Sequence, residues 1–148
     1  MFTELTSQIY LFAVFVTVAF AWWKGERPER IGSLFNAILS IGVVLFQTIT
    51  NQAYETTPIL IGDGLLATGF LVLALRYASL WLAAAMVLQA ATFLIHASLL
   101  MGLLPEGHPP MRFYYMTMNM LGALVMVSIL LGTAGAWYQR SVLRAKAA

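Results

Sequence analysis

Ionisable and amide side chains recur at helical spacing in segments of this chain that are otherwise apolar. Gln89, Thr92 and His96 are three and then four residues apart, so they share one face of a helix. Asp63 stands between two glycines in another apolar segment. Ionisable groups are costly in hydrocarbon and normally face a bundle interior or a cavity. A carboxylate beside an imidazole can hold a proton or a polar ligand, so Asp63 and His96 are the candidates for titratable chemistry.

Two further apolar segments carry polar stripes of the same kind. They are the stripe Asn36, Ser40, Gln47 and Asn51, and the face formed by Arg112, Tyr115, Asn119 and Gly122. Counting inward from the segment ends puts Asp63 and His96 in the outer half of the membrane and leaves no ionisable side chain in the inner half. The sequence therefore predicts an outward-facing polar cleft with seven candidate ligand-binding residues: Gln47, Asn51, Asp63, Gln89, His96, Tyr115 and Asn119.

Two other interpretations of these polar residues stay open. Side-chain hydrogen bonds join membrane helices at about 0.6 kcal/mol each, and amide stripes are typical of such contacts. Imidazole and thioether groups also suit Cu(I), which makes a metal site a further alternative. Its candidate ligands are His96, His108, Met116 and Met120, although methionine is also an ordinary apolar filler.

The residues that the chain lacks narrow the chemistry. It has no cysteine, which excludes disulfides, thiolate-bound zinc and iron–sulfur clusters. With two histidines in the chain, bis-histidine haem ligation within one molecule is strained, and the cofactor stays unknown. The sequence contains no catalytic motif such as a Ser/His/Asp arrangement or a glycine-rich phosphate loop. A non-enzymatic role is therefore expected.

The elements that position these residues are predicted to be membrane-spanning helices. The composition is 61% hydrophobic and 9% charged, whereas soluble domains carry about 25% charged residues. Five segments approach the roughly 20 apolar residues that a span needs: Leu5–Trp23, Ile31–Thr50, Pro58–Leu75, Ser79–Leu104 and Phe113–Tyr138. The predicted fold is all-α, a polytopic membrane protein with five transmembrane helices in a single bundle (residues 1–138) and a basic cytoplasmic tail (residues 139–148).

The connection Arg76–Ala78 contains neither glycine nor proline. An unbroken helix over Pro58–Leu104 would nevertheless run about 70 Å, over twice the hydrocarbon thickness. A tight hairpin is therefore predicted there. It makes the two segments antiparallel neighbours and places Asp63 and His96 at depths that differ by about 5 Å.

The basic residues predict the orientation, because Lys and Arg accumulate in cytoplasmic loops. With the N-terminus outside, seven of the eight lie on the inner side, and Arg112 lies outside. The inner seven are Lys24, Arg27, Arg30, Arg76, Arg140, Arg144 and Lys146. All four tryptophans (Trp22, Trp23, Trp81 and Trp137) fall at the same interface. The expected location is a bacterial-type inner membrane.

Small residues predict where helices touch closely. Ser128, Gly132 and Ala136 repeat every four residues, and Tyr10, Ala13, Thr17 and Ala21 form a comparable narrow face. Internal packing is the expected use of both.

The function expected from the sequence is that of an accessory subunit or a small-ligand-binding component. The first alternative is an oligomeric transporter or channel for protons or a small solute that uses Asp63 and His96. The second is a copper- or haem-binding membrane protein. The expected partners are the lipid bilayer and other membrane subunits or further copies of this chain. Nucleic acid is not expected, because no Lys/Arg cluster is interleaved with aromatic residues.

Overall fold

The computed structural model describes residues 2–50, 56–103 and 111–147, and the elements assigned within them are all helices. These are α1 (Phe2–Lys24), α2 (Arg27–Thr50), α3 (Thr56–Tyr77), α4 (Leu80–Leu100) and α5 (Met111–Ala147). The prediction of an all-α bundle is confirmed for the part of the chain that is described.

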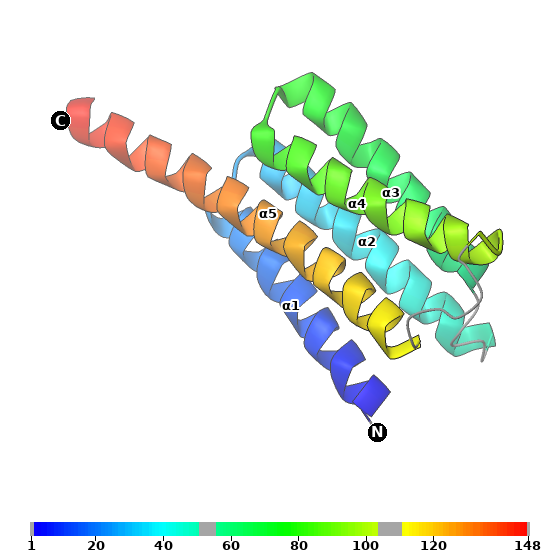
Figure 1. Ribbon diagram of the computed structural model, residues 1–148. Helices are drawn as coiled ribbons and strands as arrows, with labels where there is room; N and C mark the ends of the chain where they lie inside the picture. The colour runs from blue at the N-terminus through cyan, green and yellow to red at the C-terminus, as the bar shows by residue number, and fades with distance from the viewer. Residues whose placement is uncertain (1, 51–55, 104–110, 148) are drawn as a thin grey trace.

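The helices form a ring in which neighbours in sequence are neighbours in space. α1 packs against α2, α3 against α2 and α4, and α5 against α4. A contact between α1 and α5 closes the ring, and α2 also reaches α5 across it. The helices alternate in direction, with the N-terminus at one end and the C-terminus at the other (Figure 1). The predicted antiparallel hairpin of α3 and α4 is confirmed.

One end of the bundle is basic. It contains the α1–α2 and α3–α4 connections and the side of α5 nearest the C-terminus (Figure 1). The seven residues that the sequence assigned to one face all belong to this end: Lys24, Arg27, Arg30, Arg76, Arg140, Arg144 and Lys146. We call it the basic end and the opposite one the N-terminal end.

Four helices are long and apolar enough to cross a membrane: α2, α3, α4 and the greater part of α5. In α1 the segment Gln8–Lys24 is a shorter apolar helix. Large apolar side chains, including Ile49, Leu75 and Leu80, are widely exposed on the outside of the bundle. Such a surface is costly in water and suits lipid, so the fold is that of a membrane-embedded helical bundle.

Several helix boundaries differ from those predicted, most at the start of α2 and at the ends of α4 and α5. α4 ends at Leu100, four residues before the predicted Leu104. α2 begins at Arg27, so the α1–α2 connection is Gly25–Glu26, which is shorter than the predicted Lys24–Arg30. The prediction missed this start because it defined each helix by its apolar segment, and the first turn of α2 is mostly charged. α5 continues to Ala147, so the described part of the tail is a helical continuation of the last predicted span.

Glycines set how closely the helices approach. A Cβ added at Gly69 of α3 would lie 2.0 Å from the Phe35 ring of α2. A Cβ at Gly132 of α5 would lie 2.5 Å from the indole of Trp81. The predicted small-residue seam of α5 therefore packs inside the bundle, where Gly132 lies against the aromatic ring of Trp81.

Candidate functional site

Asp63, Gln89 and His96 meet inside the bundle. Gln89 Nε2 donates a hydrogen bond to Asp63 Oδ1 at 2.6 Å. His96 Nδ1 lies 2.8 Å from Asp63 Oδ2, and the two side chains are 6% and 13% exposed respectively. The contact predicted between Asp63 and His96 is therefore present. The predicted polar face of α4 is also present, because Ala85, Gln89, Thr92 and His96 are all buried.

The hydrogen-bond geometry fixes the position of one proton. His96 Nδ1 is 3.0 Å from the carbonyl oxygen of Thr92, which can only accept. Nδ1 therefore carries a proton. Among the described residues, the buried Oδ2 of Asp63 receives no hydrogen bond with good angles despite its short distance from Nδ1. Two atoms of the pair, Asp63 Oδ2 and His96 Nε2, can thus take up a further proton.

Glycines on both sides of Asp63 allow this close packing. A Cβ at Gly62 would lie 3.0 Å from Val43 Cγ2 of α2, and one at Gly64 would lie 3.2 Å from the Phe93 ring of α4. Larger residues at these positions would push α3 away from its neighbours at the level of the carboxylate. The Gly-Asp-Gly sequence is therefore a packing feature of a helix.

Two tyrosines that the sequence did not single out for the site lie near this cluster. The Tyr114 ring packs edge-on against the His96 ring, with centroids 5.6 Å apart. Tyr10 Oη lies 3.4 Å from Ser40 Oγ of α2. The presence of Tyr10 on the narrow face of α1 was the available signal for its inward position.

Other sequence candidates are not brought to the cluster. Asn119 is exposed, so its placement in the cleft was wrong. None of the described side chains of residues 113–124 in α5 is buried. Val125 is the first buried residue among those described in this helix. The side chains of Gln47 and Tyr115, and the whole of Asn51, lie outside what the structure describes.

The copper alternative is not supported by the described residues. Met116 and Met120 are 61% and 66% exposed, whereas His96 is buried against Asp63. His108 lies outside the described residues. No group of three or more His, Cys, Asp or Glu side chains able to hold a metal occurs in the described part of the chain.

A second buried carboxylate, Glu29, lies near the basic end and is 4% exposed. Its Oε2 accepts a hydrogen bond from the Glu26 backbone N–H at 2.9 Å, and its Oε1 accepts one from Trp81 Nε1 at 3.1 Å. Glu29 was predicted to lie in a connection, whereas the structure places it in the first turn of α2. A Glu at the third position of a helix that caps its own N-terminus is a recognisable signal.

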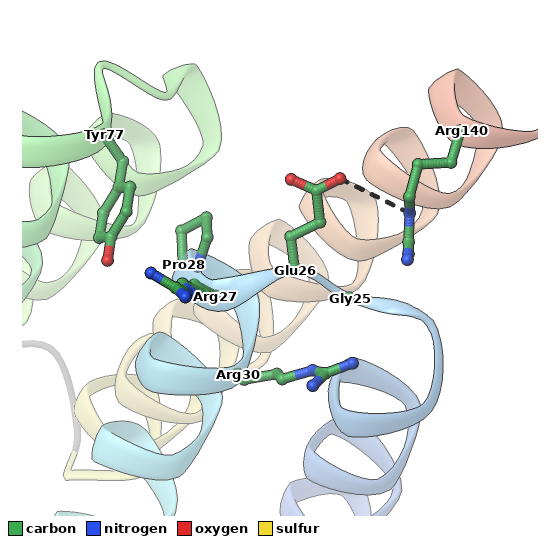
Figure 2. A pocket seen from close by; sticks show the side chains of 7 residues that line it. All are labelled: Gly25, Glu26, Arg27, Pro28, Arg30, Tyr77 and Arg140. Atoms are coloured by element: carbon green, nitrogen blue, oxygen red, sulfur yellow. Dashed lines mark ion pairs between the residues drawn. The ribbon is translucent and has the colours of Figure 1, made fainter. Parts of the chain in front are cut away.

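A pocket of about 550 Å³ opens beside Glu29 at the basic end. Figure 2 shows the residues that line it: Gly25, Glu26, Arg27, Pro28, Arg30, Tyr77 and Arg140. Arg140 Nε lies 3.6 Å from Glu26 Oε1, and its Nη2 donates to the Lys24 carbonyl. The pocket therefore combines three arginines with one carboxylate.

Comparisons with protein-family models, curated proteins and solved structures gave no match.

Proposed function

We propose that the protein is a non-enzymatic, membrane-embedded bundle whose Asp63–His96 pair binds and releases a proton. The observation that carries this proposal is the 2.8 Å contact between a buried carboxylate and a buried imidazole. Gln89 occupies the other carboxylate oxygen at 2.6 Å. Contacts this short leave no space between these side chains for a solute, whereas a proton fits on either Asp63 Oδ2 or His96 Nε2.

Because the Asp63–His96 pair is buried, adding or removing a proton changes the net charge of the bundle interior. With His96 neutral and Asp63 ionised, the pair carries a net charge of −1. One added proton brings that charge to zero, whether it resides on the imidazole or on the carboxyl group. Because a net charge in an apolar interior is costly, proton uptake and release switch the core between two electrostatic states.

The proposed setting is a bacterial-type inner membrane that all five helices cross, with the N-terminus outside. The concentration of seven of the eight Lys and Arg residues at the basic end supports a cytoplasmic location for that end. The proton site then communicates with the outer side, while the exposed apolar helix faces contact lipid or other membrane subunits.

Infrared difference spectroscopy of the protein in lipid, over a pH series, tests the proton site. We expect a carboxyl band that changes with pH, is lost in Asp63→Asn and moves in His96→Gln. The control is Thr68→Val, an exposed position on the same helix whose hydroxyl bonds to its own backbone at Gly64. A carboxyl spectrum that is the same in wild type and Asp63→Asn at every pH would refute the proposal.

A further inference from the structure

Buried polar side chains form a stripe along α2 from the basic end toward the Asp63–His96 pair. Glu29, Ser33 and Asn36 are 4%, 0% and 3% exposed, and Ser40 is half-buried. Their spacing of four, three and four residues puts all of them on one helix face. From Glu29 to Ser40 the stripe rises by eleven residue steps, or about 16 Å of helix.

The stripe ends close to the level of the proton site. Ser40 Oγ lies 3.4 Å from Tyr10 Oη of α1. Three residues beyond Ser40, Val43 of α2 packs against Gly62, the residue before Asp63, because a Cβ at Gly62 would lie 3.0 Å from Val43 Cγ2. Thr17 of α1 and Thr133 of α5 add two more buried hydroxyls, from the two helices that close the ring beside α2. The interior thus contains polar groups between two buried acids, one toward each end of the bundle.

Helix–helix hydrogen bonding does not account for several of these groups. Ser33 Oγ donates to the carbonyl of Arg30, Thr17 Oγ1 to that of Ala13, and Thr133 Oγ1 to that of Ile129. Each of these bonds stays within its own helix. The hydroxyls are therefore buried without tying two helices together, since each donates its proton to a carbonyl of its own helix.

The pocket in Figure 2 lies next to the buried Glu29. Pro28 and Arg30, immediately before and after Glu29, line it, and so does Glu26, whose N–H bonds to Glu29 Oε2. Trp81 covers the carboxylate from α4. The charged groups of the pocket are Arg27 and Arg30 of α2, Arg140 of α5 and Glu26, with Tyr77 from α3. The pocket lining beside Glu29 therefore carries a net positive charge.

We propose that the α2 stripe is a proton path between the Asp63–His96 pair and Glu29, and that the protein conducts protons across the membrane. This inference rests on the proton-binding function proposed above. Each hydroxyl along the path accepts a proton on its oxygen and passes its own proton onward, so it is unchanged after one transfer. Asn36 has no hydroxyl, so the proton passes this position on a water that the amide binds. Steps of three or four residues are about 4.5–6 Å long, a span that one bridging water can cover.

Proton flux into proteoliposomes tests the path. The vesicles contain a pH-sensitive dye, and a potassium gradient with valinomycin drives proton entry. We expect Glu29→Gln and Asn36→Leu each to lower the wild-type rate by about tenfold or more. The matched control is Thr48→Val, an exposed position on α2 whose hydroxyl bonds to its own backbone at Val44, which should leave the rate unchanged.

Infrared measurements on the same variants separate failure of the path from failure of the proton site. A pH-dependent Asp63 band in Asn36→Leu shows that this variant is folded, and an unreduced flux in that variant would then overturn the path. Wild-type vesicles no more permeable to protons than empty ones would overturn conduction, while a titrating Asp63 leaves proton binding in place. Loss of flux in Glu29→Gln with full flux in Asp63→Asn would contradict a role for the pair in conduction.

Discussion

At the scale of single residues, Trp81 joins three helices. A Cβ added at Gly32 of α2 would lie 3.0 Å from the Trp81 ring, and one at Gly132 of α5 would lie 2.5 Å from it. The ring nitrogen donates to Glu29 Oε1. The sequence predicted an interfacial role for this tryptophan along with the other three. Its position near the basic end agrees with that role, but its ring is also a packing element.

Replacing Trp81 by phenylalanine is expected to destabilise the bundle by about 1–3 kcal/mol, because the buried Glu29 carboxylate loses a donor. Trp23→Phe is the control, since Trp23 is 76% exposed, and should change stability by less than about 0.5 kcal/mol. Denaturant unfolding in a mild detergent measures both variants. Equal stabilities would show that the hydrogen bond to Glu29 contributes nothing.

The residue-scale predictions succeeded where helical spacing and hairpin geometry both applied. Those two constraints put Asp63 and His96 at similar depth on neighbouring helices, and the structure has them in contact. Spacing alone failed for Asn119, because a shared helix face does not reveal where along α5 the bundle stops covering it. Glu29 was missed for a different reason: its helix was assumed to begin where the apolar residues begin.

At the scale of elements, the α3–α4 turn depends on an unusual backbone conformation. Ala78 has φ = 47° and donates its N–H to the carbonyl of Ala74 at 2.8 Å. Helices commonly end in this left-handed conformation, but usually with glycine, because a Cβ is strained there. Sequence propensity therefore gave no stop signal at this position, and the hairpin was predictable only from the thickness of a membrane.

Ala78→Gly is expected to stabilise the hairpin by about 1 kcal/mol, since the strain of the left-handed alanine is removed. The contrasting control is Ala84→Gly, at an exposed position inside α4, which should destabilise by roughly 0.5–1 kcal/mol. Thermal unfolding in detergent compares the two. A loss of stability in Ala78→Gly as large as that in Ala84→Gly would contradict the proposed strain.

Gly132→Leu is expected to disrupt the packing of α5 on α4. Even its Cβ would lie 2.5 Å from the Trp81 ring, and overpacking of this kind costs about 1–3 kcal/mol or more. Gly135→Leu is a control less than one turn away, with no neighbouring atom within 4 Å of the added Cβ. Size-exclusion elution and melting should change for Gly132→Leu alone, and unchanged behaviour in both would place Trp81 elsewhere.

At the scale of the whole molecule, the two ends of the bundle differ in charge and in length. α5 has 37 residues, or about 55 Å of helix, which is well above the roughly 30 Å of the hydrocarbon core. It extends beyond the other helices at the basic end (Figure 1). This part carries Arg140, Arg144 and Lys146. Such an extension suits the cytoplasmic surface, where anionic lipids attract Lys and Arg.

Reporter fusions test this orientation, because each connection of a five-span bundle lies on a defined side. A reporter that is active only outside the cytoplasm should work after Asn51 or Glu106, and it should be silent after Gly25 or at the C-terminus. The physical reason is the seven-to-one distribution of Lys and Arg, whose translocation is unfavourable. An active C-terminal fusion would overturn the proposed orientation.

The first helix needs a separate measurement, because four spans without α1 would give the same result for all four fusions. The chain contains no cysteine, so Thr3→Cys introduces a unique thiol. If α1 spans the membrane, a membrane-impermeant maleimide should label this thiol in intact cells. Ser141→Cys, in the exposed basic end of α5, is the matched control and should react only after the membrane is opened. Labelling of Thr3→Cys that also requires an opened membrane would place the N-terminus inside. Tyr10, the partner of Ser40 at the end of the α2 stripe, would then lie on a helix that does not cross the bilayer.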